Sequence, residues 1–103
     1  MKIICITACI GGIAHTYMAA EAITKAARES GDEVRIEIQG AMGIENQLTE
    51  DEIDEADMVI FAVNMNVRGE DRFEGKNPIV IDPGKFVGNG PKALQEAKEL
   101  AGF

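Results

Sequence analysis

The segment Cys9–Thr16 constrains the fold of this chain more than any other part of its sequence. It stands between a short apolar run, Ile3–Ile6, and a long alanine-rich segment, Tyr17–Arg28. An apolar run of this length, bounded by turn residues, is typical of a buried strand, and the alanine-rich segment carries its apolar residues at helical spacing. The sequence therefore predicts a strand, a tight loop containing Gly11 and Gly12, and a helix, in that order.

The loop at this junction is suited to hold an anion. The first N–H groups of a helix have no backbone partner, and loop N–H groups add to them, so together they form a concave anion site. A thiolate placed there is stabilised by the helix dipole and is reactive. We therefore interpret Cys9 as a nucleophile rather than as a cysteine that only packs at the end of a strand. The loop residues expected to surround the anion are Ile10, Gly11, Gly12, Ile13, Ala14, His15 and Thr16.

Two side chains at the start of the predicted helix add to this loop. A thiolate held by backbone N–H groups is suited to attack phosphorus, because the same donors hold the phosphoryl oxygens. We expect His15 to stay neutral beside the helix N-terminus and to hydrogen-bond the loop or the thiol. A histidine that only packs or caps the loop is an equal alternative. Thr16 is interpreted either as a hydroxyl donor to the loop or the anion, or as an ordinary helical residue.

The rest of the chain predicts a single α/β domain, residues 1–103. Strands are expected at residues 2–8, 34–38, 58–63 and 78–81, and helices at 16–30, 50–56 and from 91 onward. Strands that are apolar throughout are covered on both faces. We therefore expect a three-layer fold: a four-stranded, mainly parallel sheet with helices on both faces and a phosphate-binding-type loop after the first strand. Ligands bind such sheets at the carboxyl ends of the strands, where the loops at 39–45 and 64–71 should also lie.

Weaker signals refine this prediction. Residues 34–38 alternate between apolar and charged side chains, which places Arg35 and Glu37 on one face of a strand near the edge of the sheet. Thr49 followed by Glu52 is a capping-box pattern that predicts the start of a short helix. Two arginines, at positions 68 and 72, could reach an anion at the sheet edge, but we take both as solvated surface residues. The segment 82–84 is expected to end the last strand.

Composition excludes several classes of function. The net charge is −8 without a cluster of Lys or Arg, which argues against binding of nucleic acid through phosphates. The longest apolar stretch, Met58–Val63, is too short to span a membrane, and no signal peptide is recognisable, so we expect a cytoplasmic protein. Cys5 and Cys9 lie too far apart along one extended segment to pair, and two free thiols fit a reducing compartment. With one histidine and two cysteines, we expect neither a metal site nor a cofactor.

The segment Cys9–Glu21 closely resembles the active-site segment of the fructose-type enzyme IIB components of the bacterial phosphoenolpyruvate-dependent sugar phosphotransferase system (PTS). Gln39–Asn46, Glu52–Ala62 and the pair Arg72-Phe73 are similar to the same family, so the resemblance covers most of the chain. It implies a phosphotransferase whose loop cysteine, here Cys9, accepts a phosphoryl group from a phosphohistidine of a IIA component. The cysteine would then pass that group to a sugar, fructose or fructose-like, bound by the membrane IIC component.

One departure from the family concerns the loop itself. The family usually has Pro-Thr after the cysteine, whereas this chain has Ile10-Gly11, which removes a hydroxyl and makes the loop looser. A paralogue of altered specificity would have such a loop. The chain begins at Met1 and is expected to be a free-standing subunit that docks its two partners in turn through apolar contacts. Those contacts are expected from Ile10, Ile13 and the loop around Met42.

Two other functions remain open at this point. Small tyrosine phosphatases have a cysteine, five residues and then an arginine, so a cysteine-loop phosphatase or arsenate-reductase-like enzyme is one alternative. Here His15 occupies the arginine position, and the bidentate guanidinium clamp is missing. The other alternative is a phosphorylation-dependent regulatory binding module that keeps the fold without passing the phosphoryl group to a sugar.

Overall fold

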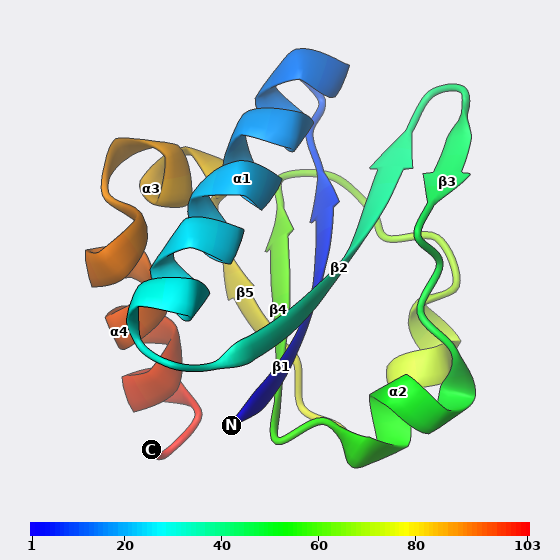
Figure 1. Ribbon diagram of the computed structural model, residues 1–103. Helices are drawn as coiled ribbons and strands as arrows, with labels where there is room; N and C mark the ends of the chain where they lie inside the picture. The colour runs from blue at the N-terminus through cyan, green and yellow to red at the C-terminus, as the bar shows by residue number, and fades with distance from the viewer.

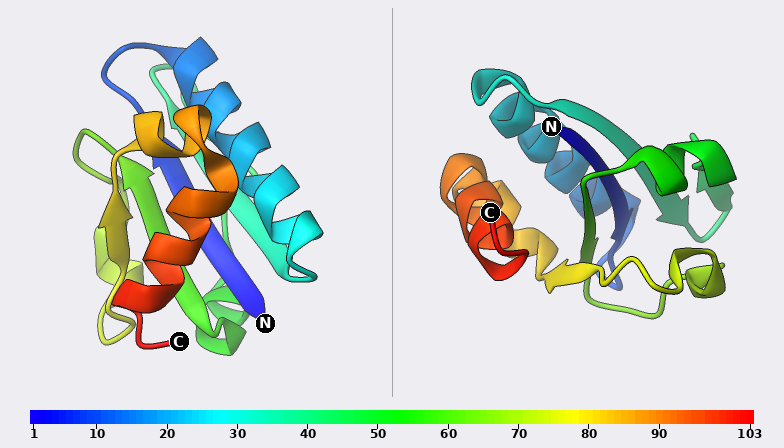
Figure 2. Two further views of the ribbon diagram at one scale, coloured as in Figure 1. Left: turned by 90° about the vertical axis from the view of Figure 1, so that its left-hand side faces the viewer. Right: turned by 90° about the horizontal axis from the view of Figure 1, so that it is seen from below.

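The computed structural model describes all residues, 1–103, and places a five-stranded sheet between two layers of helices (Figures 1 and 2). The strand order is β3-β2-β1-β4-β5. The strands are β1 (Lys2–Ala8), β2 (Glu33–Gly40), β3 (Gly43–Glu45), β4 (Met58–Val63) and β5 (Ile79–Ile81). All neighbouring pairs are parallel except β2 and β3, which are antiparallel. The central strand is β1, whose residues 3–9 are all buried.

Three helices cover one face of the sheet. They are α1 (Ile13–Glu29), α3 (Pro83–Gly88) and α4 (Gly90–Leu100), which lie together on one side in Figure 2. Small residues let these helices approach closely: a Cβ on Gly90 would lie only 3.0 Å from the carbonyl oxygen of Ala22 in α1. The larger of two apolar cores, with 16 buried residues, fills this side and includes Ile23, Ile60 and Phe86.

The opposite face is covered by α2 (Glu50–Glu55) and the 3-10 turn η1 (Glu70–Phe73). A core of 8 buried residues lies beneath them, in which the rings of Phe61 and Phe73 meet edge to face at 5.1 Å. The predicted capping box is confirmed: the Thr49 side chain accepts from the Glu52 N–H, and Glu52 accepts from the Thr49 N–H. The expected helices on both faces are therefore present, but the second layer is thinner than the first.

The number of strands and one helix differ from the prediction. The sequence predicts four strands, but Gly43 adopts a φ of 136° and returns the chain antiparallel to β2, so β3 is a fifth strand; β2, next to it, lies near the edge of the sheet as expected. The helix α3 is not predicted by the sequence pattern, which indicates only that residues 82–84 end the last strand. It begins where the Asp82 carboxylate accepts from the Gly84 N–H at 2.8 Å. The first helix begins at Ile13 rather than at Thr16, so the predicted loop and the helix overlap.

The amino ends of the central strands are tied to the helices by charge pairs. Asp32 accepts from the N-terminal amino group at 3.0 Å and from Lys98 Nζ of α4 at 2.6 Å. The hydrogen bond from Lys98 is the main reason that the pKa of Asp32 lies well below its usual value. No helix of the structure is both long and apolar enough to cross a membrane.

Candidate functional site

Cys9 lies directly after β1 at the carboxyl edge of the sheet (Figure 1). The strand β1 has β2 on one side and β4 on the other. The connection from β1 to β2 therefore leads toward one edge of the sheet, and the later strands β4 and β5 lie toward the other edge. A crevice at such a reversal of strand order is the general ligand-binding position of open α/β sheets. The structure therefore places Cys9 at the carboxyl edge of the sheet, where the strand order reverses.

The loop after Cys9 presents several backbone donors without partners. The Gly12 N–H bonds the Cys9 carbonyl oxygen at 3.4 Å, and Gly12 is the N-cap of α1 with a φ of 117°, a value that favours glycine. No hydrogen-bond partner is found for the N–H groups of Gly11, Ile13, Ala14 and His15. These donors at a helix N-terminus are the type of group that holds a phosphoryl oxygen.

His15 contacts the thiol. Its Nδ1 lies 3.3 Å from Cys9 Sγ, and Cys9 is only 8 % exposed. The contact forms either when S–H donates to Nδ1 or when Nδ1–H donates to a thiolate. Thr16 is fully buried and donates its hydroxyl to the Gly12 carbonyl oxygen at 3.3 Å. His15 therefore contacts the thiol, and the Thr16 hydroxyl donates to the loop.

The second thiol lies in a different environment. Cys5 sits in the middle of β1, is completely buried and donates to the Ile6 carbonyl oxygen at 3.6 Å. Desolvation raises its pKa to about 12, so this thiol stays protonated at neutral pH. Both cysteines are free, as the spacing along the strand predicted.

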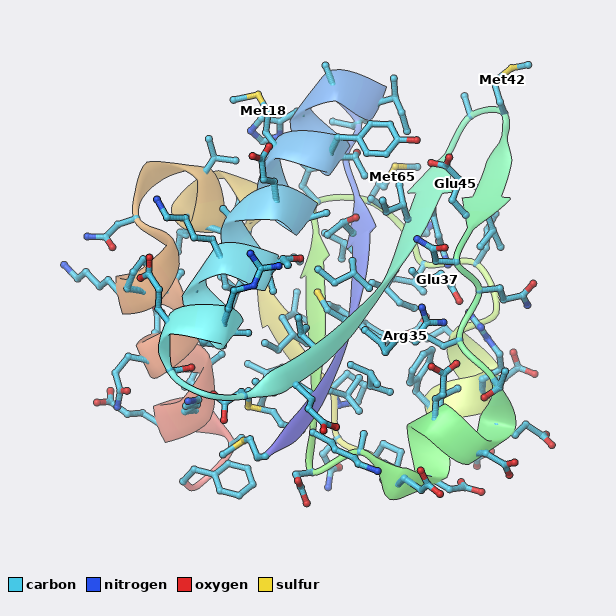
Figure 3. All side chains as sticks on the ribbon, viewed as in Figure 1. Met18, Arg35, Glu37, Met42, Glu45 and Met65 are labelled. Carbon is cyan, nitrogen blue, oxygen red and sulfur yellow. The ribbon has the colours of Figure 1, made fainter.

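A groove of about 920 Å³ opens beside Cys9 between the start of α1, the β2–β3 hairpin and the loop after β4. The loops predicted at 39–45 and 64–71 supply its rim, so this expectation is confirmed. Met42 at the tip of the hairpin and Met65 in the facing loop are both exposed (Figure 3). The exposed apolar side chains that line the groove are Ile10, Ile13, Tyr17, Met42, Ile44 and Met65. Tyr17 also donates a hydrogen bond across the groove to Glu45.

A buried polar network fixes one wall of this groove. Glu37 is completely buried between β2 and the segment that joins β3 to α2 (Figure 3), and both of its oxygens accept from the Arg72 guanidinium at 2.8 Å. Gln39 donates to Glu37 at 2.7 Å and clamps the backbone of Arg68, donating to its carbonyl oxygen and accepting from its N–H, both at 2.8 Å. The loop after β4 is therefore anchored to the end of β2.

This network corrects one prediction. Arg72 is not a solvated surface arginine: it pairs with Glu37, which lies on the same face of β2 as Arg35 but is buried. Burial disfavours the Glu37 carboxylate, but hydrogen bonds from Arg72, Gln39 and the Leu48 N–H outweigh burial, so the pKa of Glu37 is lowered. Arg68 is exposed as expected, yet it is the only Lys or Arg that lines the groove, and it donates to the Gly40 carbonyl oxygen.

The sequence interpretation also missed Asn64, which follows β4 directly. Its Oδ1 accepts from the Ile10 N–H at 2.8 Å, and its own N–H donates to the Ala8 carbonyl oxygen at 3.2 Å. A polar residue at the end of a strand next to β1 was the available signal. The role of Cys9 itself, and of the loop around it, stays a prediction.

Comparisons with known proteins agree with this architecture. The family model described as "PTS system, Lactose/Cellobiose specific IIB subunit" matches residues 4–96. The "PTS system fructose-like EIIB component 2" of Escherichia coli (strain K12) is 48% identical over 81 residues, which cover 79% of this chain and 76% of that protein. The "PTS system 2-O-alpha-mannosyl-D-glycerate-specific EIIABC component" of the same organism is 41% identical over 98 residues, 95% of this chain but only 15% of that protein.

Solved structures give the same result. The solution structure of an enzyme IIB subunit of the PTS system from Escherichia coli K12 superposes with a TM-score of 0.87 at 40% identity, over 96% of this chain and 92% of that one. A crystal structure of a domain of the fructose-specific IIABC component from Borrelia burgdorferi gives a TM-score of 0.84 at 40% identity, over 95% and 93% of the two chains. At these identities the likeness extends beyond the fold to the family.

Proposed function

We propose that Cys9 is the phosphoryl carrier of this chain, which belongs to the IIB subunits of the sugar phosphotransferase system. A fructose-like EIIB is a phosphoryl-transfer component and works with IIA and IIC partners; one relative carries all three components in a single chain. The observation that carries the proposal is the position of Cys9 at the carboxyl end of β1, beside four N–H groups without partners and 3.3 Å from His15 Nδ1.

The first step transfers a phosphoryl group to the protein. The Cys9 thiolate attacks the phosphorus of a phosphohistidine on a IIA component; the S–P bond forms as the N–P bond breaks. The proton that the thiol released balances the proton that the freed imidazole takes up. The unpartnered N–H groups of Gly11, Ile13 and Ala14 supply donors for the phosphoryl oxygens, where charge accumulates in the transition state.

The second step removes the phosphoryl group. A hydroxyl of the sugar held by the membrane IIC component attacks the phosphorus, the O–P bond forms, and the S–P bond breaks to restore the thiolate. The hydroxyl proton passes to a base of the IIC component or to water. The loop donors serve both steps, since the same phosphoryl oxygens are held before and after the transfer.

The substrate class is proposed from the relatives. Two of the proteins compared above are described as fructose-like or fructose-specific, and a third as specific for 2-O-alpha-mannosyl-D-glycerate. We therefore propose fructose or a fructose-like sugar. The choice among such sugars is proposed to lie largely with the IIC component.

The groove beside Cys9 is proposed as the docking surface for both partners in turn. Ile10 and Met42 are 80% and 101% exposed, although the chain carries a net charge of −8. An exposed apolar cluster with little charge around a reactive group is typical of a protein–protein contact. IIA and IIC cannot occupy this surface together, which makes the transfer sequential.

Intact-mass measurement tests the proposal. The protein is incubated with phosphoenolpyruvate, the general phosphotransferase proteins and a fructose-type IIA component; a lactose-type IIA component is run in parallel. We expect a gain of one phosphoryl group that persists in Cys5→Ser and vanishes in Cys9→Ser. Uptake that survives Cys9→Ser would contradict the proposal.

A further inference from the structure

We propose that Asn64 is a positioning residue for the Cys9 loop. Its hydrogen bond to the Ile10 N–H fixes the backbone at residue 10, as the ring of a proline does when proline occupies that position. The proposal rests on the role of Cys9 given above. The parallel register pairs Ala8 of β1 with Val63 of β4, so the next residues, Cys9 and Asn64, lie side by side at the carboxyl edge of the sheet. Asn64 is exposed and belongs to no other hydrogen-bonded cluster.

Asn64 brackets the candidate nucleophile on both sides. Its backbone N–H donates to the carbonyl oxygen of Ala8, the residue before Cys9, at 3.2 Å. Its side-chain Oδ1 accepts from the N–H of Ile10, the residue after Cys9, at 2.8 Å. The single residue that follows β4 thus fixes the direction in which the chain enters the loop and the direction in which it leaves Cys9.

The loop needs such an anchor because its next two residues are glycines. Glycine has more backbone freedom than any other residue, and a Cβ added at Gly11 or Gly12 would meet no atom within 4 Å, so neighbouring packing does not confine them. The only backbone hydrogen bond within residues 9–12 is that from the Gly12 N–H to the Cys9 carbonyl oxygen, which is long at 3.4 Å. Without the Asn64 contact, the N–H groups meant for the phosphoryl oxygens would lose their alignment.

The position of Ile10 explains the comparison with proline. The bond from Gly12 to Cys9 makes residues 9–12 a four-residue turn, in which Ile10 is the second residue and has no positive φ. Proline is favoured at this position because its ring fixes φ near the required value of about −60°. Proline has no N–H, however, so a loop with proline there can neither make nor use a bond to Asn64. The Ile10 N–H and the Asn64 side chain are therefore a matched pair.

A double-mutant cycle tests this pairing without relying on phosphoryl transfer. The wild type, Asn64→Ala, Ile10→Pro and the double variant are compared by the pH profile of Cys9 alkylation with iodoacetamide. The plateau rate reports exposure of the sulfur, whereas the midpoint reports stabilisation of the thiolate. Loss of one loop-fixing hydrogen bond should raise the midpoint by about half a pH unit in Asn64→Ala. In the Ile10→Pro background the same substitution should leave the midpoint unchanged.

Hydrogen exchange of the Ile10 amide reports on the contact directly. We expect Asn64→Ala to accelerate this exchange and Asn64→Asp, which keeps the acceptor oxygen, to preserve its protection. Asn64→Leu, which keeps the size of the side chain without an acceptor, repeats the comparison if Asn64→Ala lowers the melting temperature. Equal midpoint shifts in both backgrounds, or no shift in either, would overturn the proposal.

Phosphoryl uptake from a IIA donor is measured on the same four proteins. We expect it to be slowed about fivefold in Asn64→Ala and not slowed further in the double variant than in Ile10→Pro. A wild type that takes up no phosphoryl group would refute the proposed role of Cys9, whereas the alkylation cycle would still decide whether Asn64 positions the loop. The two failures are therefore distinguishable.

Discussion

The two ends of the central strands are built in opposite ways. At the amino ends, polar groups are paired: Asp32 bonds the N-terminus and Lys98, and Asp57 accepts from the Lys2 N–H at 2.8 Å. At the carboxyl ends, backbone donors around Cys9 have no partners and apolar side chains such as Met42 are exposed. One end of the sheet thus contributes stability, while the other leaves polar donors and apolar side chains free, as the proposed phosphoryl and docking site requires.

The buried network behind the carboxyl edge is the exception to this division, and its removal should have the largest effect on stability. Glu37→Gln leaves the half-buried Arg72 guanidinium without its charged partner, and we expect the free energy of unfolding to fall by about 3 kcal/mol. Urea unfolding measures the change. The matched control, Glu96→Gln, removes the charge from an exposed pair with Lys85 and should cost no more than about 0.5 kcal/mol. An equal decrease in the free energy of unfolding in both variants would show that the buried pair of Glu37 with Arg72 does not stabilise the fold more than an exposed pair.

A substitution at Gly12 tests whether the loop after Cys9, at the carboxyl ends of the strands, needs the backbone geometry that glycine allows. Gly12→Ala has room for its Cβ but must adopt a φ of 117°, and we expect a loss of stability of about 1–3 kcal/mol together with slower phosphoryl uptake. Thermal unfolding and intact-mass kinetics measure the two effects. Gly11→Ala, whose φ is not positive, is the control for stability and should fold as well as the wild type. Full activity of Gly12→Ala would argue against a fixed loop.

A single substitution removes the ion pairs at the amino ends of the central strands. Asp32→Asn removes the charge that pairs with the N-terminus and Lys98, and we expect a loss of about 1 kcal/mol at pH 7 without a change in phosphoryl uptake. Because the folded state lowers the pKa of Asp32, the stabilisation is present above the ordinary aspartate value of about 3.9 and is lost as the pH falls below it. Unfolding of both proteins from pH 7 to pH 3 should show the difference shrinking. A difference that grows toward low pH would contradict the ion pairs.

The smallest effect on stability, with a clear effect on function, is expected at the tip of the hairpin. Met42 is completely exposed, so Met42→Asp should leave the free energy of unfolding unchanged but weaken docking of both partners. Rates of phosphoryl transfer from IIA and to the sugar measure the effect. Leu100→Asp, an exposed apolar residue at the end of α4, is the control that should slow neither step. Unchanged transfer in Met42→Asp would argue against the groove as the docking surface.

The sequence predicted the parts of the molecule that are set by local pattern. The central strands are apolar without interruption, the capping box starts α2, and the glycines after Cys9 mark the loop, so these elements were expected. The strand β3 and the helix α3 were missed because they have 3 and 6 residues and depend on a hairpin and a cap rather than on periodicity.

For the site too, local pattern predicts the contiguous residues but not the contacts between distant ones. Cys9 and its neighbours are contiguous, so the loop and the contact with His15 were within reach of sequence reasoning. Arg72, the charged partner of Glu37, and Asn64, the partner of Ile10, lie 35 and 54 residues away along the chain, and no local pattern connects these pairs. The alternation around Glu37 was misleading, because β2 is covered on both faces near its carboxyl end rather than exposed on one.

The central claim is that the sulfur of Cys9, and not the imidazole 3.3 Å from it, carries the phosphoryl group. Phosphorus NMR of the protein phosphorylated by its IIA donor distinguishes the two, because phosphorus bonded to sulfur and phosphorus bonded to nitrogen resonate at well-separated shifts. We expect a single signal of the S–P type that persists in His15→Ala at reduced intensity. A signal of the N–P type that disappears in His15→Ala would contradict the account.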